Sequence, residues 1–401
     1  MKRWLSFLVK LLAGAVLLAL AVIAVLWWVT KPARPDDFYL RSPEFPASPG
    51  KIVKIEPFAR MVPATANGWR LSYSTTRFDG SIAPASAIVL APKERKAEPA
   101  NVIAWTHGTT GFDPACAPSV LDEPFANVPA LEEALAEGWV IVATDYIGLG
   151  TEGPHPYLIG EGQARSALDS IRALKQIENI NVSDNVVVWG HSQGGNAALW
   201  TGILAASYAP DVKINGIAAL APATDLPGLV KAAEKTSVGK ILSSYIISAY
   251  SGTYPDVKFE EYIKPLARPV VSDMSSRCLA GTEALFLVAE TFITGETIFA
   301  KDPTSGPLGE RLKENTPNRP IPAPVMIAQG LTDELVLPEL QQAFVDERCK
   351  AGQAVEYARY YERDHLTLVA KDSPLTGDLI GWTRDRQKEK AAAATCSFSD
   401  R

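Results

Sequence analysis

Short apolar runs alternate with amphipathic stretches along most of the chain. Apolar runs with little polar alternation are typical of parallel strands covered on both faces, and apolar residues at helical spacing indicate helices. The predicted strands are Asn101–Trp105, Trp139–Thr144, Asn185–Trp189, Ile214–Leu220, Val325–Ala328 and Val355–Tyr361. The predicted helices are Leu131–Glu137, Glu161–Ile177, Asn196–Tyr208 and Pro338–Lys350. This order predicts an α/β fold with a mostly parallel sheet flanked by helices.

Two stretches depart from that alternation. Trp69–Thr76 and Ile82–Leu90 flank Asp79-Gly80, which predicts an antiparallel hairpin. About 100 residues separate the strand ending at Leu220 from the next one. A crossover connection needs far fewer residues, so we expect an inserted, mainly helical subdomain there.

The N-terminus has the pattern of an export signal. Three basic residues precede the uncharged run Leu11–Thr30, whose 20 residues would form a helix of ~30 Å, the thickness of a bilayer's hydrocarbon core. Because more positive charge lies before the run than after it, we expect a transmembrane signal anchor with the body outside the cytoplasm. The sequence Ala19-Leu20-Ala21 leaves a cleaved signal peptide, and hence a secreted protein, as the alternative.

The expected organisation follows from these features. It comprises the signal segment 1–32, a linker at 33–57 rich in proline and charge, the first part of an α/β core at 58–221, the inserted subdomain at 222–322 and the second part of the core at 323–401.

Composition narrows the function classes. The 39 basic and 45 acidic residues give a net charge of −6, which does not favour a nucleic-acid partner. The chain has no H-E-x-x-H, no paired C-x-x-C and no P-loop, so we expect neither a metal nor a cofactor.

The pentapeptide Gly190-His191-Ser192-Gln193-Gly194 stands between a predicted strand and a predicted helix. A G-x-S-x-G sequence in this setting is typical of a nucleophile elbow, where a sharp turn exposes the serine. The two glycines leave room where a Cβ would clash, and the helix N-terminus directs N–H groups at a forming oxyanion. We therefore expect Ser192 to be a nucleophile, the alternative being a tight turn with an inert serine.

A serine nucleophile needs a base and an acid, in the chain order serine, acid, histidine. Among the four histidines, His365 alone follows Ser192 outside the pentapeptide. Asp333, just after the strand Val325–Ala328, is the favoured acid. Asp225 and Glu334 remain rivals.

An oxyanion hole needs two N–H donors. The residue after the nucleophile, Gln193, should supply the first. The loop His107-Gly108-Thr109-Thr110-Gly111 should supply the second, from Thr109 or Thr110. We expect His107 to support this loop, and Asp145–Gly150 to form either a pocket wall or a simple turn.

These motifs together resemble the secretory lipase family of α/β-hydrolases. The resemblance rests on His107–Gly111 with Cys116 soon after, Asp145–Gly150, Gly190–Gly194, Gly330–Val336 and His365. It covers nearly all of the exported part. It implies a serine esterase acting on small-molecule acyl esters or lipids, often triacylglycerols, with the insertion as a lid over an acyl tunnel.

The four cysteines should form two disulfides if the body is exported. They allow three pairings. With the family resemblance added, we favour Cys116–Cys278, between the oxyanion-side loop and the insertion, and Cys349–Cys396, at the C-terminal tail.

The sequence thus predicts a serine carboxylic-ester hydrolase. An acyltransferase or a serine peptidase on the same fold, or a non-catalytic binding protein, are the alternatives. Within the insertion, we expect the apolar segment Ala284–Ile293 to shape the pocket and to set the preferred acyl length.

Overall fold

A computed structural model describes residues 2–29, 31–40, 45–94 and 97–401. Within them, one ten-stranded sheet runs in the order β1-β2-β3-β5-β4-β6-β7-β8-β9-β10. In that spatial order, each strand from β5 through β4 and on to β10 is parallel to its neighbour. The remaining pairs, β1–β2, β2–β3 and β3–β5, are antiparallel. The strands are β1 (Ile52–Phe58), β2 (Ala66–Thr76), β3 (Ile82–Pro92), β4 (Ala100–Thr106), β5 (Val140–Thr144), β6 (Val182–His191), β7 (Ile214–Leu220), β8 (Val325–Gly330), β9 (Val355–Tyr360) and β10 (Ser397–Asp400).

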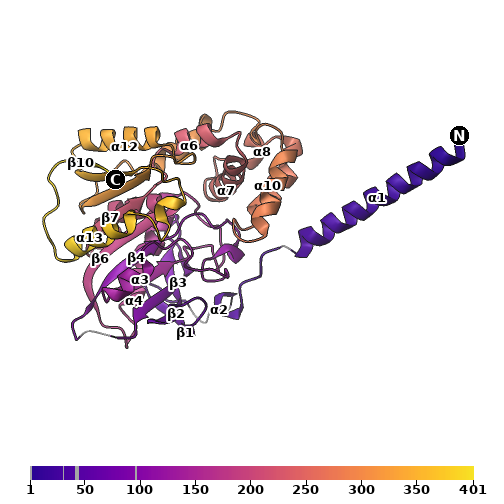
Figure 1. Cartoon of the computed structure of the whole chain (residues 1–401). Coiled ribbons are helices and arrows are strands. Elements are labelled where there is room, and N and C mark those ends of the chain that lie inside the picture. Colours follow the sequence, from indigo (N-terminus) through magenta and orange to yellow (C-terminus); the bar gives the residue numbers. More distant parts are fainter. Residues whose placement is uncertain (1, 30, 41–44, 95–96) are drawn as a thin grey trace.

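Helices flank the sheet and fill the insertion (Figure 1). Those outside the insertion are α1 (Lys2–Val29), α2 (Asp37–Leu40), α3 (Leu131–Ala136), α4 (Gly160–Leu174), α5 (Gln193–Tyr208), α12 (Pro338–Lys350) and α13 (Leu375–Gln387). Those of the insertion are α6 (Leu226–Ala233), α7 (Ser237–Thr253), α8 (Phe259–Tyr262), α9 (Arg268–Ser275), α10 (Glu283–Ile293) and α11 (Gly306–Glu314). Short 3₁₀ turns lie at Pro114–Cys116, Pro265–Ala267 and Thr367–Val369.

Strand β6 shows why the central strands contain continuous apolar runs. Val186 and Val188 face a core cluster that includes residues of α4 and α5. Val187 and Trp189 face a second cluster that includes residues of α3 and α13. Because both faces are covered at Val186–Trp189, all four positions of this stretch are apolar. The prediction of a mostly parallel sheet flanked by helices, and that of the hairpin β2–β3, are confirmed.

The insertion between β7 and β8 has a core of its own. Residues of α6, α7, α9, α10 and α11 form a third cluster, which also takes in Tyr157, Leu158 and Ile159 from the segment before α4. Figure 1 shows these helices on one side of the sheet, near the place where α1 enters the body. The insertion is therefore a packed helical layer rather than a loose connection.

The predicted linker at 33–57 is wrong in part. Residues 41–44 lie outside the described residues, but α2 and most of β1 fall within the segment. Strand β1 forms because β2 offers it a partner: Ile55 lies opposite Leu71, and Glu56 is bound by Arg70 at 2.8 Å. The core therefore begins at Ile52 rather than at residue 58.

Helix α1 covers most of the predicted membrane segment, whose last residue, Thr30, is outside the described residues. Figure 1 shows α1 projecting from the body. In the part of the chain that the structure describes, no helix combines the length and the apolar character needed to cross a membrane.

Two disulfides fix distant parts of the chain. Cys116 is bonded to Cys278, and Cys349 to Cys396, which is the pairing favoured from the sequence. The first joins the loop after β4 to the segment between α9 and α10. The second fixes the segment that leads into β10, which pairs with β9.

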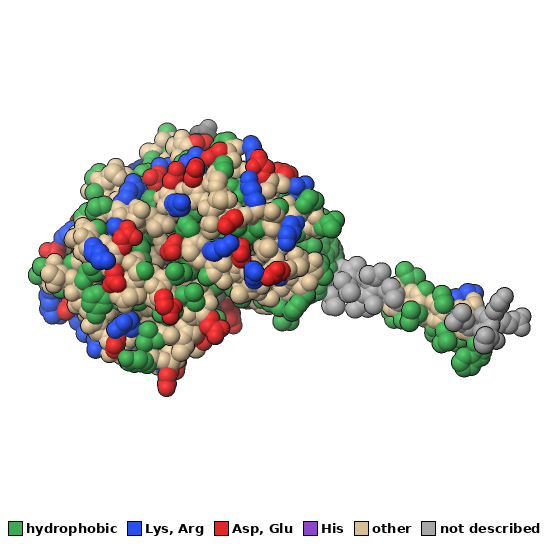
Figure 2. Space-filling view, turned by 90° about the horizontal axis from the view of Figure 1, so that it is seen from above, with side chains coloured by type: hydrophobic (Ala, Val, Ile, Leu, Met, Phe, Trp, Pro, Cys, Tyr) green, Lys and Arg blue, Asp and Glu red, His purple; other side chains and the backbone are tan. Residues whose placement is uncertain are grey.

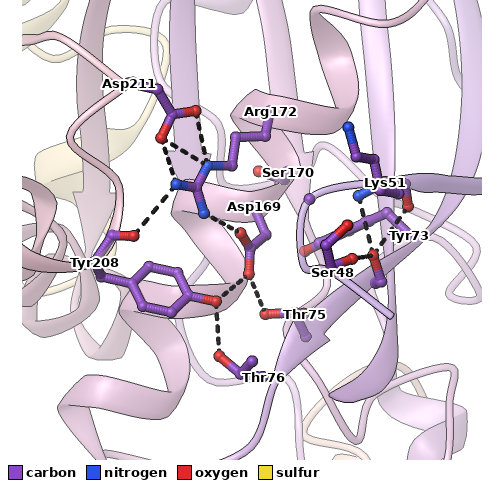
Figure 3. Close-up of polar contacts among 12 residues, drawn as sticks. Ser48, Lys51, Tyr73, Thr75, Thr76, Asp169, Ser170, Arg172, Tyr208 and Asp211 are labelled. Carbon is purple, nitrogen blue, oxygen red and sulfur yellow. Dashed lines mark hydrogen bonds and ion pairs between the residues drawn. The ribbon is translucent and has the colours of Figure 1, made fainter. Parts of the chain in front are cut away.

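A buried polar network holds α4 and α5 to the hairpin (Figure 3). The fully buried carboxylate of Asp169 accepts hydrogen bonds from Tyr208 Oη at 2.6 Å, Thr75 Oγ1 at 2.7 Å and Arg172 Nη1 at 3.0 Å. Arg172 also binds Asp211. Burial raises the pKa of Asp169, and these donors oppose that shift by stabilising the charged form. The network fixes α5, whose N-terminus follows Ser192.

The surface carries both signs of charge. Figure 2 shows acidic and basic side chains interspersed over the face seen from above, with no broad basic area on that face.

Candidate active site

Ser192 occupies a strained turn between β6 and α5. Its backbone has φ +58° and ψ −119°, a conformation that L-residues rarely adopt. A Cβ at Gly190 would overlap the carbonyl of Gly194, and one at Gly194 would overlap the carbonyl of Thr106. Only glycine fits at both positions, so the predicted strand–turn–helix setting of the pentapeptide is confirmed.

His365 and Asp333 meet beside this turn. Nδ1–H of His365 donates to Asp333 Oδ2 at 2.8 Å. The aspartate side chain is fully buried, and the histidine side chain is 12% exposed. With Nδ1 carrying the proton, Nε2 of the neutral ring keeps a lone pair and is a proton acceptor.

The Asp333 carboxylate is held by three further donors. Oδ1 accepts the backbone N–H groups of Leu335 at 2.9 Å and Val336 at 2.8 Å, while Gln329 Nε2 donates to Oδ2 at 3.1 Å. These donors satisfy both oxygens of the buried carboxylate. They also fix the orientation of the carboxylate and hence of the His365 ring.

The two rival acids lie elsewhere. Asp225 is the N-cap of α6, where its Oδ1 accepts from the N–H of Gly228 at 3.0 Å. Glu334 is exposed to solvent. The structure therefore brings Asp333, and neither rival, into contact with His365.

His191 links the His365 loop to the elbow. Its Nε2–H donates to the carbonyl of His365 at 2.8 Å, and the two ring centroids are 4.7 Å apart. Burial, followed by the nearby His365, lowers the pKa of His191 to about 3. His191 is therefore neutral at physiological pH, and its hydrogen bond ties the His365 loop to the residue that precedes Ser192.

The loop after β4 packs against His191 and Ser192. At Gly108, a Cβ would stand only 3.6 Å from Ser192 Cβ, so the loop packs directly on the elbow. Thr109 lines the same cavity as Ser192 and Gln193. Thr110 instead accepts the N–H of Leu279 on its carbonyl at 2.7 Å. Of the two threonines left open by the sequence, Thr109 lines the cavity and Thr110 is absent from its lining.

His107 is buried and supports this loop. Its ring nitrogens lie 2.6 Å from the carbonyl of Gly108 and 3.2 Å from that of Asp145, and burial lowers the pKa of His107. The segment Asp145–Gly150 has positive φ at Tyr146, Gly148 and Gly150 and is absent from the lining of the Ser192 cavity, which favours the turn interpretation.

A narrow cavity opens from the elbow into the insertion. Its volume is about 50 Å³. Ser192, Gln193 and Thr109 are among its lining residues, and the rest of the lining is mostly apolar. Its wall residues on the insertion are Ala223, just before α6, and the following residues of α6 and α7: Leu226, Leu229, Val230, Ala233, Gly239, Leu242, Ser243 and Ile246.

The expectation that Ala284–Ile293 shapes the pocket is therefore wrong for this cavity. None of these residues lines it. On α10, Leu287 is buried in the core of the insertion, whereas Leu285, Phe292 and Ile293 are more than 70% exposed. The segment is apolar in sequence, but only one side of the helix packs inward and that side faces α7 and α9.

Two residues that contact the site, His155 and Tyr157, were not predicted from the sequence. His155 lies 3.2 Å from the Gln193 side chain (Nε2 to Nε2), and Tyr157 Oη lies 2.7 Å from Thr109 Oγ1. Both stand in an irregular segment between β5 and α4 with no motif around them. No local pattern identifies them, since their contacts lie about 40 and 50 residues away in the chain.

The chain is similar to known lipases in sequence and in fold. The family model described as Secretory lipase matches residues 126–395. The chain is 26% identical to Lipase 6 of Candida albicans, over 92% of this chain and 85% of that protein. It is also 26% identical to the secreted triacylglycerol lipase LIP4 of Malassezia globosa, over 82% and 74%. Among solved structures, lipase A of Candida antarctica in its closed state superposes with a TM-score of 0.74 at 20% identity, covering 90% of this chain and 87% of that one.

Proposed function

The chain belongs to the secretory lipase family, and from this premise we propose that it hydrolyses carboxylic esters through an acyl-enzyme on Ser192. The observation that carries the proposal is the hydrogen bond between His365 and Asp333, held by His191 against the strained turn of Ser192. Relatives named as lipases support the reaction class.

The proposed reaction has two halves. His365 Nε2 takes the proton of Ser192 as Oγ attacks the ester carbonyl, and then gives that proton to the departing alcohol. Water, deprotonated by the same nitrogen, next attacks the acyl-enzyme and releases the acid and free Ser192. Asp333 keeps His365 in the Nδ1–H tautomer and stabilises the imidazolium.

The tetrahedral oxyanion is stabilised by backbone N–H groups of Gln193 and Thr109. Gln193 is the first residue of α5, so its N–H has no partner within the helix and is free to bind an anion. Each donor of this kind contributes ~3 kcal/mol to the transition state.

The substrate class follows from the cavity. An apolar wall beside the nucleophile suits the hydrocarbon part of an acyl group better than a peptide backbone, which would lose hydrogen bonds there. Assay of the purified protein on p-nitrophenyl esters from acetate to palmitate tests the proposal. We expect turnover with saturation on part of this series, and an enzyme inactive on all of it would contradict ester hydrolysis.

Residues of α7 should set the preferred chain length. We expect Leu242→Trp, in the cavity wall, to lower the ratio of decanoate to butyrate turnover about tenfold, because the indole occupies space needed by the longer chain. The matched control is Leu285→Trp on α10, which is 73% exposed and should leave the ratio unchanged. If Leu285→Trp changed the ratio and Leu242→Trp did not, the chain-length role would belong to Ala284–Ile293, as expected from the sequence.

We also propose that the body is exported, with Lys2–Val29 as the targeting segment. The basic start of this helix and the two disulfides support export, because such bonds persist in oxidising compartments. We expect cell fractionation to place the protein outside the cytoplasm with no free thiols. An intact N-terminus in the membrane pellet would favour an anchor, a mature chain starting after Ala21 would favour a cleaved signal, and a reduced cytoplasmic protein would contradict export.

A further inference from the structure

The segment His155–Tyr157, called the brace segment below, contacts both residues assigned to the oxyanion hole. It lies between β5 and α4, outside the elbow and outside the loop after β4. Its two ends reach the two halves of the hole: Tyr157 contacts Thr109, and His155 contacts Gln193. Neither contact has a part in the proton transfers described above.

The contact with Thr109 joins two hydroxyl groups. Tyr157 Oη and Thr109 Oγ1 are 2.7 Å apart, and Tyr157 is only 1% exposed. Burial raises the pKa of Tyr157, so the phenol keeps its proton and remains a donor. The bond fixes the side chain of Thr109, a residue that lines the cavity beside Ser192.

The contact with Gln193 depends on the tautomer of His155. The carbonyl of Ile147, 3.2 Å from Nδ1, can only accept, so Nδ1 carries the proton and Nε2 is an acceptor. The Gln193 amide N–H therefore donates to Nε2. Burial lowers the pKa of His155 to about 3, which keeps the ring neutral and this acceptor available.

The brace segment is itself rigid. The N–H of Tyr157 donates to the carbonyl of His155 at 2.9 Å, closing a tight turn. The His155 ring stacks on Tyr146, which donates to the carbonyl of His107 at 3.0 Å. Tyr157 packs edge-on against Tyr245 of α7, at 5.8 Å between ring centroids. One fixed element thus contacts Thr109, Gln193 and the loop that carries Thr109.

We propose that His155 and Tyr157 are positioning residues that set the separation of the two oxyanion donors. This inference rests on the proposed function, since it assigns no role outside ester hydrolysis. An oxyanion hole acts by holding its donors in place before the reaction, so loosening one donor weakens transition-state binding more than substrate binding.

The test is a double-variant cycle on p-nitrophenyl butyrate. We expect Tyr157→Phe and Thr109→Val each to lower kcat about tenfold with KM changed less than about threefold, since each removes one side of the same hydrogen bond. The double variant should lose no more than either single variant. Inhibition by phenylboronic acid, whose serine adduct mimics the tetrahedral oxyanion, should weaken by the same factor as kcat/KM.

A second cycle and a control complete the design. His155→Phe and Gln193→Met, which keep similar volumes, should show the same non-additive loss, and they test the proposal independently if a Tyr157 variant does not fold. Tyr245→Phe removes a buried hydroxyl that donates to Arg277 and touches neither donor residue, so its kcat and boronate affinity should stay within about twofold of wild type.

The outcomes separate this inference from the proposed function. A wild-type enzyme without esterase activity overturns both. An active wild type with unchanged kcat and boronate affinity in Tyr157→Phe and His155→Phe overturns the positioning role alone. The positioning role is also overturned if, in both double variants, the fold-loss in kcat equals the product of the two single-variant losses, because the paired groups would then act independently.

Discussion

Replacing Ser192 with alanine is expected to lower kcat for ester hydrolysis by ~10⁴-fold or more while leaving the fold intact. The change removes the Oγ that forms the acyl-enzyme, so no covalent intermediate can accumulate. It removes a single oxygen from a partly exposed position, and the turn is held by glycines and backbone hydrogen bonds rather than by this side chain.

Steady-state kinetics on p-nitrophenyl butyrate, beside a thermal unfolding curve, measure both parts of this prediction. We expect the two melting temperatures to agree within a few degrees. Retention of about a tenth of wild-type turnover would mean that Ser192 is not the nucleophile.

Asp333→Asn is expected to lower kcat by ~10⁴-fold with KM little changed. The asparagine oxygen can keep the bonds from Leu335 and Val336, which leaves its NH₂ group facing His365 Nδ1. That donor forces the proton of the ring onto Nε2, and His365 can then no longer accept the proton of Ser192.

Asp225→Asn is the matched control for this prediction. Asp225 follows the neighbouring strand β7, but its carboxylate caps α6 and makes no contact with His365 in the described structure. Asparagine is also a good N-cap, so we expect a loss of less than about tenfold. A severe loss in Asp225→Asn beside a mild one in Asp333→Asn would reverse the assignment of the acid.

The order of strands and helices was predictable because the central strands are buried on both faces. Their apolar runs, such as Ile214–Leu220 in β7, stand out against the amphipathic helices that follow them. The edge strands gave no such signal. Strand β1 holds Lys54, Glu56 and Pro57, and the four residues of β10 alternate around a single Phe398. Both form because a neighbouring strand offers hydrogen bonds, which a local pattern does not contain.

The site divides in the same way. The elbow could be predicted because its pattern lies in five consecutive residues. His365 could be predicted because it is the one histidine that follows the elbow in the sequence, in a loop after a predicted strand. The choice of acid depended on which loop bends back: Gln329 and the N–H groups of residues 335 and 336 hold Asp333 toward His365, while the side chain of Asp225 turns to its own helix.

Contacts between distant segments could not be predicted. The apolar segments of α7 and α10 look alike in sequence, yet α7 lines the Ser192 cavity and part of α10 is exposed. Which helix of the insertion lines the cavity depends on the packing of the whole insertion. The contacts of His155 and Tyr157 depend on it too, since Tyr157 is part of the insertion's core.

The central claim is that Ser192 is an activated nucleophile, and its most direct test is covalent labelling of the purified protein with a fluorophosphonate followed by peptide mass spectrometry. The account predicts one adduct per chain, on the peptide containing Gly190-His191-Ser192-Gln193-Gly194, and a much slower reaction in Asp333→Asn. Absence of label in a folded, disulfide-bonded protein, or label on a different residue, would contradict it.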